Sequence, residues 1–317
     1  MKTKKQKQVS QYPMKKLPLH NSFYHLLLSS FKEWLQLLGY TSTSVSGFPY
    51  MIQEFLFFLE SQNINNIREV SAENVSTYFS LLRERLAHEG NKCLSVNYIN
   101  KHLQVLRKFS SYLRENDMGG FAIAEQALKA VKNPHEVLSK EEIQSLYNAT
   151  GNDVFGVRDK AILGLYYGAG LRRNEGVQLD KDDILFEQGL IYVRKGKNYT
   201  ERYVPVNDRV LKDLSVYQQS SREWFKYEGK EQEAFLISLK GNRLDGMSAC
   251  LRIKALQKAS DDLALLQKKI GLHSLRHSVA THLLQQGMPL QKIAQFLGHK
   301  TIESTQIYTH LAEETKT

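Results

Sequence analysis

Apolar residues recur three or four positions apart in four separate stretches of the first 120 residues. This spacing places them on one face of a helix, so it predicts four helices. Gly39 would end the first helix, Pro49 would precede the second, and the third would run from a Ser71 cap to Gly90. The predicted helices are residues 22–38, 50–63, 71–89 and 95–117. Four helices joined by short loops form a compact helical domain.

A connector follows these helices. The stretch NDMGGFAIAEQALKAVKNPHEV, residues 116–137, contains paired glycines and Pro134 and has little core of its own. Ser139 and Glu142 then form a capping-box pattern that opens a new unit. We therefore expect a flexible basic arm at residues 1–18, a helical domain at 19–120, a linker at 121–136 and a second domain at 137–317.

The second domain contains one strand region in a mostly helical pattern. Residues 189–206, GLIYVRKGKNYTERYVPV, place Ile, Tyr and Val on either side of a polar centre. Two such runs around a polar turn predict a β-hairpin with a basic loop. The expected fold class is therefore mainly α, with a four-helix domain followed by a mixed α+β domain that is mostly helical.

The chain carries an excess of positive charge. Its 317 residues include 43 Lys and Arg against 33 Asp and Glu, a net charge of +10. This excess favours a polyanionic partner, either nucleic acid or a membrane surface. No stretch approaches the roughly 20 apolar residues of a membrane span, and no apolar segment directly follows the basic start, so neither a membrane anchor nor a secretory signal is expected. Cys93 and Cys250 lie far apart, which favours two reduced thiols.

Residues 271–284, GLHSLRHSVATHLL, gather three histidines and an arginine. His273, Arg276 and His277 stand at i, i+3 and i+4, so a helix would place them on one face. A zinc site of the H-E-x-x-H type is disfavoured, because Ser274 follows the first histidine and a fixed cation would lie beside a dication.

This histidine cluster separates into two groups. His277 and His282 lie among apolar residues that must pack, and we interpret them as structural. His273 and Arg276 follow Gly271 on the first turn of the predicted helix, where backbone N–H groups and the helix dipole favour an anion. A histidine with a forked guanidinium suits a phosphodiester better than a metal.

Two basic segments precede this cluster, and each also has a simpler interpretation. In GAGLRRNE, residues 168–175, glycines allow a close approach and Glu175 stands three positions after Arg172. This segment is otherwise a helix start with solvated arginines. The hairpin loop carries Lys195 and Lys197, which either enter a groove or deliver a proton, or are simply solvated.

The last candidate segment is FLGHKTIESTQIYTH, residues 296–310. His299 follows a glycine, and Tyr308 stands nine residues later on a helix predicted to begin near Thr301. Tyrosine is a weak nucleophile with a pKa near 10, but it attacks phosphorus when cations lower the cost of ionisation and a base is near. The alternative for Tyr308 is an aromatic packing residue.

Taken together and in order, these segments resemble the tyrosine recombinases, which are phage-type integrases and Xer-like resolving enzymes. GAGLRRNE resembles that family's TGLRxSE box, and HSLRHSVATHLL resembles its HxLRHxxATxLL box. LGHKTIESTQIYTH matches the LGHxxxxxTxxYxH box closely. The resemblance covers the whole chain, because the helical domain is similar to the family's SAM-like core-binding domain.

The resemblance implies a role for each candidate residue in holding a DNA phosphate. Arg172 and Arg276 would grip the non-bridging oxygens of the scissile phosphate. His299 would bond a phosphate oxygen, and Glu175 would occupy the acidic, supporting position of its box. Fixed donors of this kind stabilise the charge that develops on the equatorial oxygens, so the family chemistry requires no metal, cofactor or ATP.

The resemblance also implies the covalent and proton-transfer steps. Tyr308 would attack phosphorus to give a 3′-phosphotyrosine and a free 5′-hydroxyl. Lys195 would act as general acid at the leaving oxygen, and His273 would assist proton transfer to and from the tyrosine. The loop KGKNYTERYVP is longer than the typical KGxKxRxVP, so the lysine is either Lys195, which we favour, or Lys197.

Two further departures from the family boxes are small. Ala169 stands where the family often has Thr, and Arg173 and Asn174 replace an apolar residue and a serine. The family fold implies a C-shaped clamp on double-stranded DNA, with four protomers holding two recombination sites, in the cytoplasm. A relaxing enzyme of type IB chemistry and a non-catalytic DNA-binding relative are the alternatives.

Overall fold

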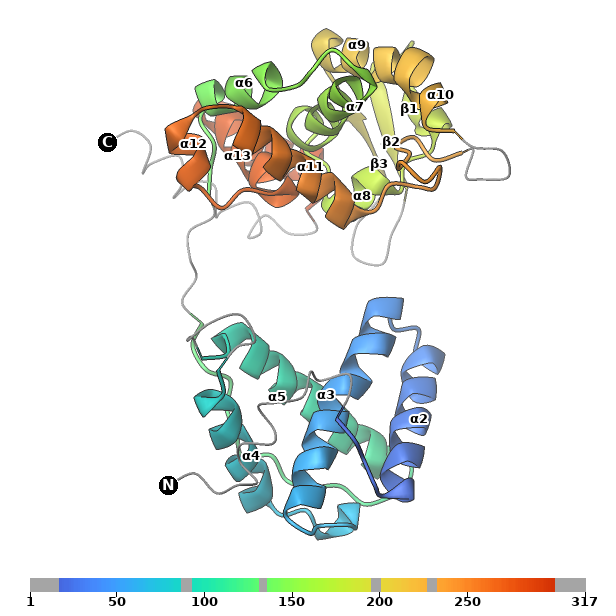
Figure 1. Cartoon of the computed structure of the whole chain (residues 1–317), viewed down its shortest axis with the longest axis vertical. Coiled ribbons are helices and arrows are strands. Elements are labelled where there is room, and N and C mark those ends of the chain that lie inside the picture. The colour runs from blue at the N-terminus through green and yellow to red at the C-terminus, as the bar shows by residue number, and fades with distance from the viewer. Residues whose placement is uncertain (1–16, 87–92, 131–135, 195–200, 227–232, 300–317) are drawn as a thin grey trace. The chain divides into compact units, whose positions relative to one another are not determined.

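The computed structural model describes residues 17–86, 93–130, 136–194, 201–226 and 233–299 (Figure 1). The chain divides into two compact units, Met1–Lys132 and Asn133–Thr317. Both are mainly helical, and the second contains a small three-stranded sheet, which confirms the predicted fold class. None of the helices in the described part combines the length and apolar character that crossing a membrane requires.

In the described residues of the first unit, four α-helices pack around a hydrophobic core. Each begins at a polar side chain that accepts a backbone N–H, and Asn21, Thr41, Ser71 and Ser95 fill these positions. Aromatic side chains fill much of the core between the helices. The elements are α2 (Ser22–Leu37), α3 (Ser42–Ser61), η2 (Ile67–Glu69), α4 (Ala72–Glu84) and α5 (Val96–Glu115).

Two helix boundaries in this unit were wrongly predicted. Helix α3 begins at Ser42 and contains Pro49, although a proline removes one backbone hydrogen bond inside a helix. The helix continues through it because Thr41 caps the start and Val45 and Phe48 are buried ahead of the proline. Helix α4 ends at Glu84, well before Gly90, because the backbone becomes extended at the next residue.

The residues that follow α5 still pack against the hydrophobic core of the first unit. Phe121 is buried in the core, and the Ser110 hydroxyl donates to its carbonyl oxygen at 2.9 Å. Ile123 and Leu128 pack against the same core as partly buried side chains. The unit therefore includes residues that have no regular secondary structure.

The second unit packs helices around and beside its sheet. Ser139 and Glu142 form the predicted capping box at the start of the first of these helices. The helical elements are α6 (Lys140–Asn148), α7 (Val154–Leu163), η3 (Gly164–Gly168), α8 (Arg173–Val177), η4 (Lys181–Asp183), α9 (Asp208–Val216), η5 (Tyr217–Ser221), α10 (Arg222–Trp224), α11 (Gly246–Ala259), α12 (Leu263–Gln267), α13 (Leu272–Gln285) and α14 (Leu290–Leu297).

The sheet contains the predicted hairpin and one additional short strand. Strand β2 (Leu190–Val193) pairs antiparallel with β3 (Arg202–Pro205), and Ile191 lies opposite Val204. Strand β1 (Ile184–Leu185), which is too short to give a period-2 pattern, pairs with the other edge of β2. The strands lie near α9 and α10, at the end of the unit away from α12 (Figure 1).

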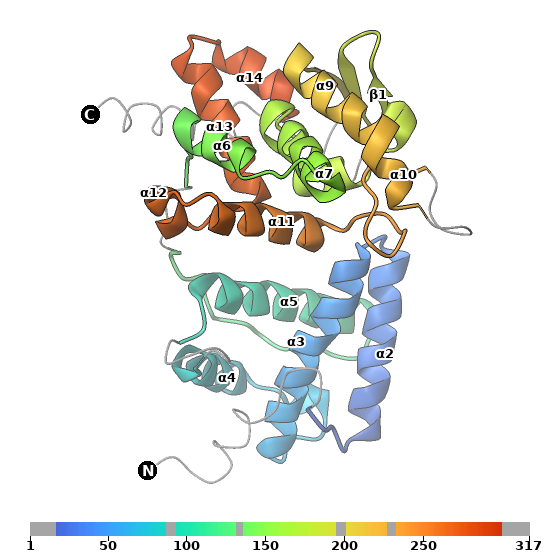
Figure 2. The ribbon, with the colours of Figure 1, turned by 45° about the horizontal axis from the view of Figure 1, so that its top comes forward.

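Helices α13 and α14 and the segment from η3 to Gly170 pack closely against one another. Helices α13 and α14 contact each other, as Figure 2 shows, and α13 also contacts the π-helical turn η3. Gly170 follows this turn with a φ of 59°. A Cβ atom there would lie 3.0 Å from side-chain atoms of both Phe296 and Leu297, so a glycine is needed for α14 to pack this closely.

Candidate functional site

Three arginines surround the buried carboxylate of Glu175, which lies on the first turn of α8 and is 3% exposed. Arg202 donates to both carboxylate oxygens, with each N–O distance 3.0 Å. Arg172 donates from its side chain and from its backbone N–H, each at 2.8 Å. Arg276 Nη1 lies 3.7 Å from the second oxygen. We call these four residues together with His299 the arginine pocket.

The C-terminal carbonyl groups of α14 bind the same arginines. Arg276 donates to Leu297 O at 2.7 Å and to Gly170 O at 2.5 Å. Arg172 donates to Leu297 O at 3.2 Å and to Gly298 O at 2.9 Å. The last carbonyls of a helix have no partner within the helix and carry its negative dipole end, so they attract cations. The helix end therefore fixes both guanidinium groups.

Gly298 ends α14 in the left-handed conformation, with a φ of 65°. This conformation turns the chain so that His299 follows directly beside the arginines. Arg202 donates from Nε to Phe296 O at 3.1 Å, and a Cβ on Gly298 would lie 2.7 Å from its Nη1. The glycine is therefore required both for the turn and for the approach of Arg202.

The charges of the arginine pocket do not balance. Burial raises the pKa of Glu175, but the hydrogen bonds and charge of Arg202, together with the hydrogen bonds of Arg172, outweigh this effect and hold the pKa below its usual value. Burial and the charges of the three arginines lower the pKa of His299 to about 4, so its imidazole is neutral at pH 7. Among the described residues, three guanidinium groups thus face one carboxylate, an excess of positive charge suited to an anion.

The structure brings together four of the residues singled out in the sequence: Arg172, Glu175, Arg276 and His299. His273 lies on the first turn of α13, as predicted, with an exposed side chain. Lys195, its alternative Lys197, and Tyr308 lie outside the described residues. Arg276 is 4% exposed, so its side chain is held in place by protein contacts.

Sequence reasoning missed Arg202. A signal was present, because Arg202 stands two positions before Val204 on a strand and therefore shares its inward face. It also occupies the arginine position of the KGxKxRxVP pattern. An arginine on the inward face of a strand needs a buried partner, and Glu175 is that partner.

His282, near the end of α13, has a packing role. His282 is 6% exposed, and its Nδ1 lies 2.9 Å from the hydroxyl of Tyr167. Burial lowers its pKa below the usual value. Within the described ranges, no group of three or more His, Cys, Asp or Glu residues is placed to hold a metal ion.

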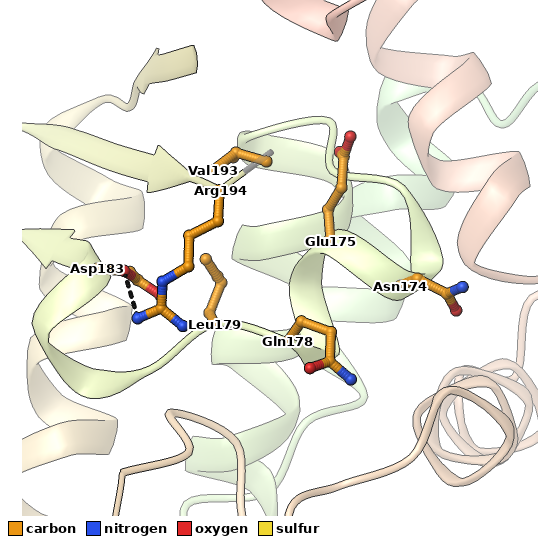
Figure 3. A pocket seen from close by; sticks show the side chains of 7 residues that line it. All are labelled: Asn174, Glu175, Gln178, Leu179, Asp183, Val193 and Arg194. Atoms are coloured by element: carbon orange, nitrogen blue, oxygen red, sulfur yellow. Dashed lines mark ion pairs between the residues drawn. The ribbon is translucent and has the colours of Figure 1, made fainter. Parts of the chain in front are cut away.

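Glu175 of the arginine pocket also lines a cleft of about 500 Å³, whose side chains are drawn in Figure 3. Arg194, at the end of β2, forms ion pairs with Asp180 at 2.5 Å and Asp183 at 2.9 Å, so its charge is largely neutralised. The side chains of Asn174 and Gln178 on the other side are exposed amides. The lining residues are Asn174, Glu175, Gln178, Leu179, Asp183, Val193 and Arg194.

Comparisons with known proteins agree on one relationship. Residues 136–315 match the Phage integrase family. The tyrosine recombinase XerC of Oceanobacillus iheyensis is 30% identical over 296 residues, which cover 91% of this chain and 92% of that protein.

Two solved structures share the fold. A XerH site-specific recombinase bound to palindromic difH substrate has a TM-score of 0.68 at 17% identity, covering 96% of this chain and 97% of that one. The Tn1549 transposon integrase in complex with transposon right end DNA has a TM-score of 0.65 at 18% identity, covering 92% and 98%.

Proposed function

The chain belongs to the phage integrase family, and on this premise we propose that it is a site-specific DNA recombinase. It cleaves and rejoins double-stranded DNA through a 3′-phosphotyrosine intermediate. The observation that carries the proposal is the excess of positive charge in the arginine pocket, where three guanidinium groups meet one carboxylate. In this proposal a DNA phosphate adds the negative charge that balances these cations.

Arg172 and Arg276 hold the scissile phosphate in this proposal. Both guanidinium groups are fixed by carbonyl oxygens of the α14 end, so they need little reorganisation when charge develops on the phosphate oxygens. The Arg172 side chain is 26% exposed and therefore reachable from solvent. His299 is neutral at pH 7 and offers one N–H to a phosphate oxygen without adding charge.

The covalent step assigns roles to Tyr308, Lys195 and His273. The Tyr308 oxygen attacks phosphorus, and the bond between phosphorus and the 5′ oxygen breaks. The tyrosine proton passes to His273, and Lys195 gives a proton to the departing 5′ oxygen. In the reverse direction, a 5′-hydroxyl attacks the phosphotyrosine and the strand is resealed. No nucleotide hydrolysis is needed, because the phosphotyrosine retains the energy of the broken diester.

The wider arrangement is also part of the proposal. The helical domain of residues 19–120 and the catalytic domain of residues 137–317 both contact DNA, with the arm of residues 1–18 adding phosphate contacts and 121–136 linking the domains. Four protomers assemble on two sites. A DNA partner places the protein in the cytoplasm. A relaxing enzyme and a non-catalytic relative are less favoured, since the named relatives are recombinases.

Covalent trapping tests the function. The protein would be expressed in its host, lysed in a strong detergent with EDTA, and the DNA attached to protein would be sequenced to define the target site. A nicked suicide duplex of that site should then accumulate an adduct with the wild-type protein. Tyr308→Phe should form none, and an adduct that persists in this variant would overturn the assignment of the nucleophile.

A further inference from the structure

Arg202 connects three parts of the second unit that are distant in sequence. It lies on strand β3, its two terminal nitrogens bond both oxygens of Glu175 on α8, and its Nε bonds Phe296 O at the end of α14. Its side chain is 9% exposed. A single guanidinium thus joins a strand, a short helix and a helix end.

The fork of bonds to Glu175 fixes the orientation of that carboxylate. Two parallel N–H···O bonds hold the plane of a carboxylate in a way that one bond does not. Glu175 in turn bonds both the side chain and the backbone N–H of Arg172. A change at Arg202 therefore reaches Arg172 through one shared carboxylate.

The hydrogen bond to Phe296 O connects Arg202 to the arginine pocket in a second way, through the end of α14. The next two carbonyls along the chain, of Leu297 and Gly298, accept hydrogen bonds from Arg276 and Arg172. Arg202 also lies directly against Gly298, where a Cβ would be within 3 Å of its guanidinium. The position of the α14 end, and of His299 after it, is therefore tied to Arg202.

We propose that Arg202 is a positioning residue for the cleavage reaction, which orients Arg172 and Arg276 through Glu175 and the α14 carbonyls. The inference rests on the proposed function, because the reaction that it serves is the one proposed above. All three guanidinium nitrogens of Arg202 donate to protein oxygens of this framework, the Nε to Phe296 O and the two Nη atoms to the Glu175 carboxylate. Lysine cannot replace it, since an ammonium donates as a point charge and lacks the planar fork.

Single-turnover cleavage of the suicide duplex, measured beside DNA affinity, separates positioning from DNA binding. Arg202→Ala should slow cleavage about 100-fold and Arg202→Lys about 10-fold, the range for loss of an outer partner of a reactive site. The dissociation constant for DNA should change by less than about threefold, because Arg202 contacts protein groups. Cleavage by Arg202→Lys at the wild-type rate, or affinity losses as large as the rate losses, would overturn the proposal.

Arg252→Ala is the matched control. Arg252 also forms a two-bond pair with a buried carboxylate, Asp159, at 3.0 and 2.6 Å, between α11 and α7 of the same unit. Its removal should cost comparable folding stability, measured by denaturation, and should leave the cleavage rate within about threefold of wild type at a temperature where all variants are folded. An equal loss of cleavage in Arg252→Ala would reduce Arg202 to a merely structural role.

The titration of His299, followed by NMR of histidine-labelled protein and assigned with His299→Gln, gives a readout that does not depend on cleavage. Removing the nearby cation Arg202 should raise the pKa of His299 from about 4, whereas Arg252→Ala should not. An unchanged pKa in Arg202→Ala would contradict the placement of Arg202. If the wild-type protein forms no adduct, the proposed recombinase function fails, and this titration still decides whether Arg202 organises the pocket.

Discussion

The described part of each unit contains a buried glutamate beside an arginine and a histidine, and the two clusters differ in their electrostatics. Glu54 in the first unit is 1% exposed and pairs with Arg85, and His102 lies 3.8 Å away. Burial raises the pKa of Glu54 more than Arg85 lowers it. Glu175 is nearly as buried, yet its pKa is lowered, because two arginines bond it directly.

The balance of charge distinguishes a structural polar cluster from an anion site. In the Glu54 cluster one carboxylate faces one guanidinium, and the Tyr78 hydroxyl bonds His102 Nδ1 at 3.1 Å, so the charges balance within the protein. In the arginine pocket, counted over the described residues, the positive charge exceeds what Glu175 neutralises. Excess charge of one sign in a partly open site indicates a ligand of the opposite sign.

Loss of Arg276 should have the largest effect, and this effect should be on the rate of DNA cleavage. Arg276→Ala removes a fixed donor from the proposed phosphate site, so single-turnover cleavage should fall by about 1000-fold, or roughly 4 kcal/mol in the barrier. Circular dichroism and DNA affinity verify that the variant is folded and bound. Cleavage within tenfold of wild type would show that the excess charge is not used on the phosphate.

Loss of Arg85 should affect stability instead. Arg85→Ala leaves Glu54 buried without its partner, which costs about 3 kcal/mol of unfolding free energy in the first unit. Urea denaturation at pH 7 measures this loss. The cleavage rate of the folded variant on saturating DNA should remain near that of wild type, and a selective loss of cleavage would contradict the division between the two clusters.

The two histidines should respond differently to DNA. Burial, reinforced by Arg85, lowers the pKa of His102 to about 3, and His299 has a pKa of about 4, so both are neutral at pH 7. A bound phosphate adds negative charge beside His299 and should raise its pKa, while His102 in the core should not change. NMR titration of Tyr308→Phe with and without the target duplex tests this, and equal behaviour of both histidines would refute it.

The lowered pKa of His102 predicts that the first unit loses stability as the solution becomes acidic. A folded-state pKa below the ordinary value of 6.5 means that the unfolded chain binds the proton first, so stability falls as the pH falls from about 6.5 towards 3. His102→Gln should reduce this loss of stability in the first unit, as followed by denaturation at pH 7, 5 and 4. An unchanged slope would show that His102 titrates normally.

The smallest effect is expected when both partners of the Glu54 pair are replaced. Glu54→Gln combined with Arg85→Met removes two buried charges together and should change the unfolding free energy by less than about 1 kcal/mol. The corresponding pair, Glu175→Gln with Arg202→Met, should abolish most cleavage. If both double variants cleave DNA, or if neither does, the proposed difference between the Glu54 cluster and the arginine pocket is wrong.

Local features of the fold were predictable from the sequence. The helix caps at Ser71 and Ser139, the hairpin strands and the helix that carries His273 and Arg276 depend on residues within a few positions of one another. The continuation of α3 through Pro49 was not predictable, because tertiary burial on both sides of the proline overrides the local preference.

The candidate site was predictable only in part for the same reason. Arg172, Glu175, Arg276 and His299 stand in short motifs. Arg202 also stands in a motif, but its pairing with Glu175 joins residues 27 positions apart, and no local pattern specifies that pairing. The role of the α14 carbonyls depends on Gly170 and Gly298, whose backbone conformations let the helix end approach. The strand pattern places Arg202 on the inward face, but the partners of both contacts are set by the tertiary packing.

In the proposed reaction, the excess charge of the arginine pocket neutralises the scissile phosphate. A suicide duplex with a neutral methylphosphonate at the scissile position removes one of the charges that the arginines would neutralise, so it tests their role. We predict that the Arg276→Ala defect shrinks from about 1000-fold on phosphate to less than about tenfold on methylphosphonate. An equal defect on both duplexes would contradict the account.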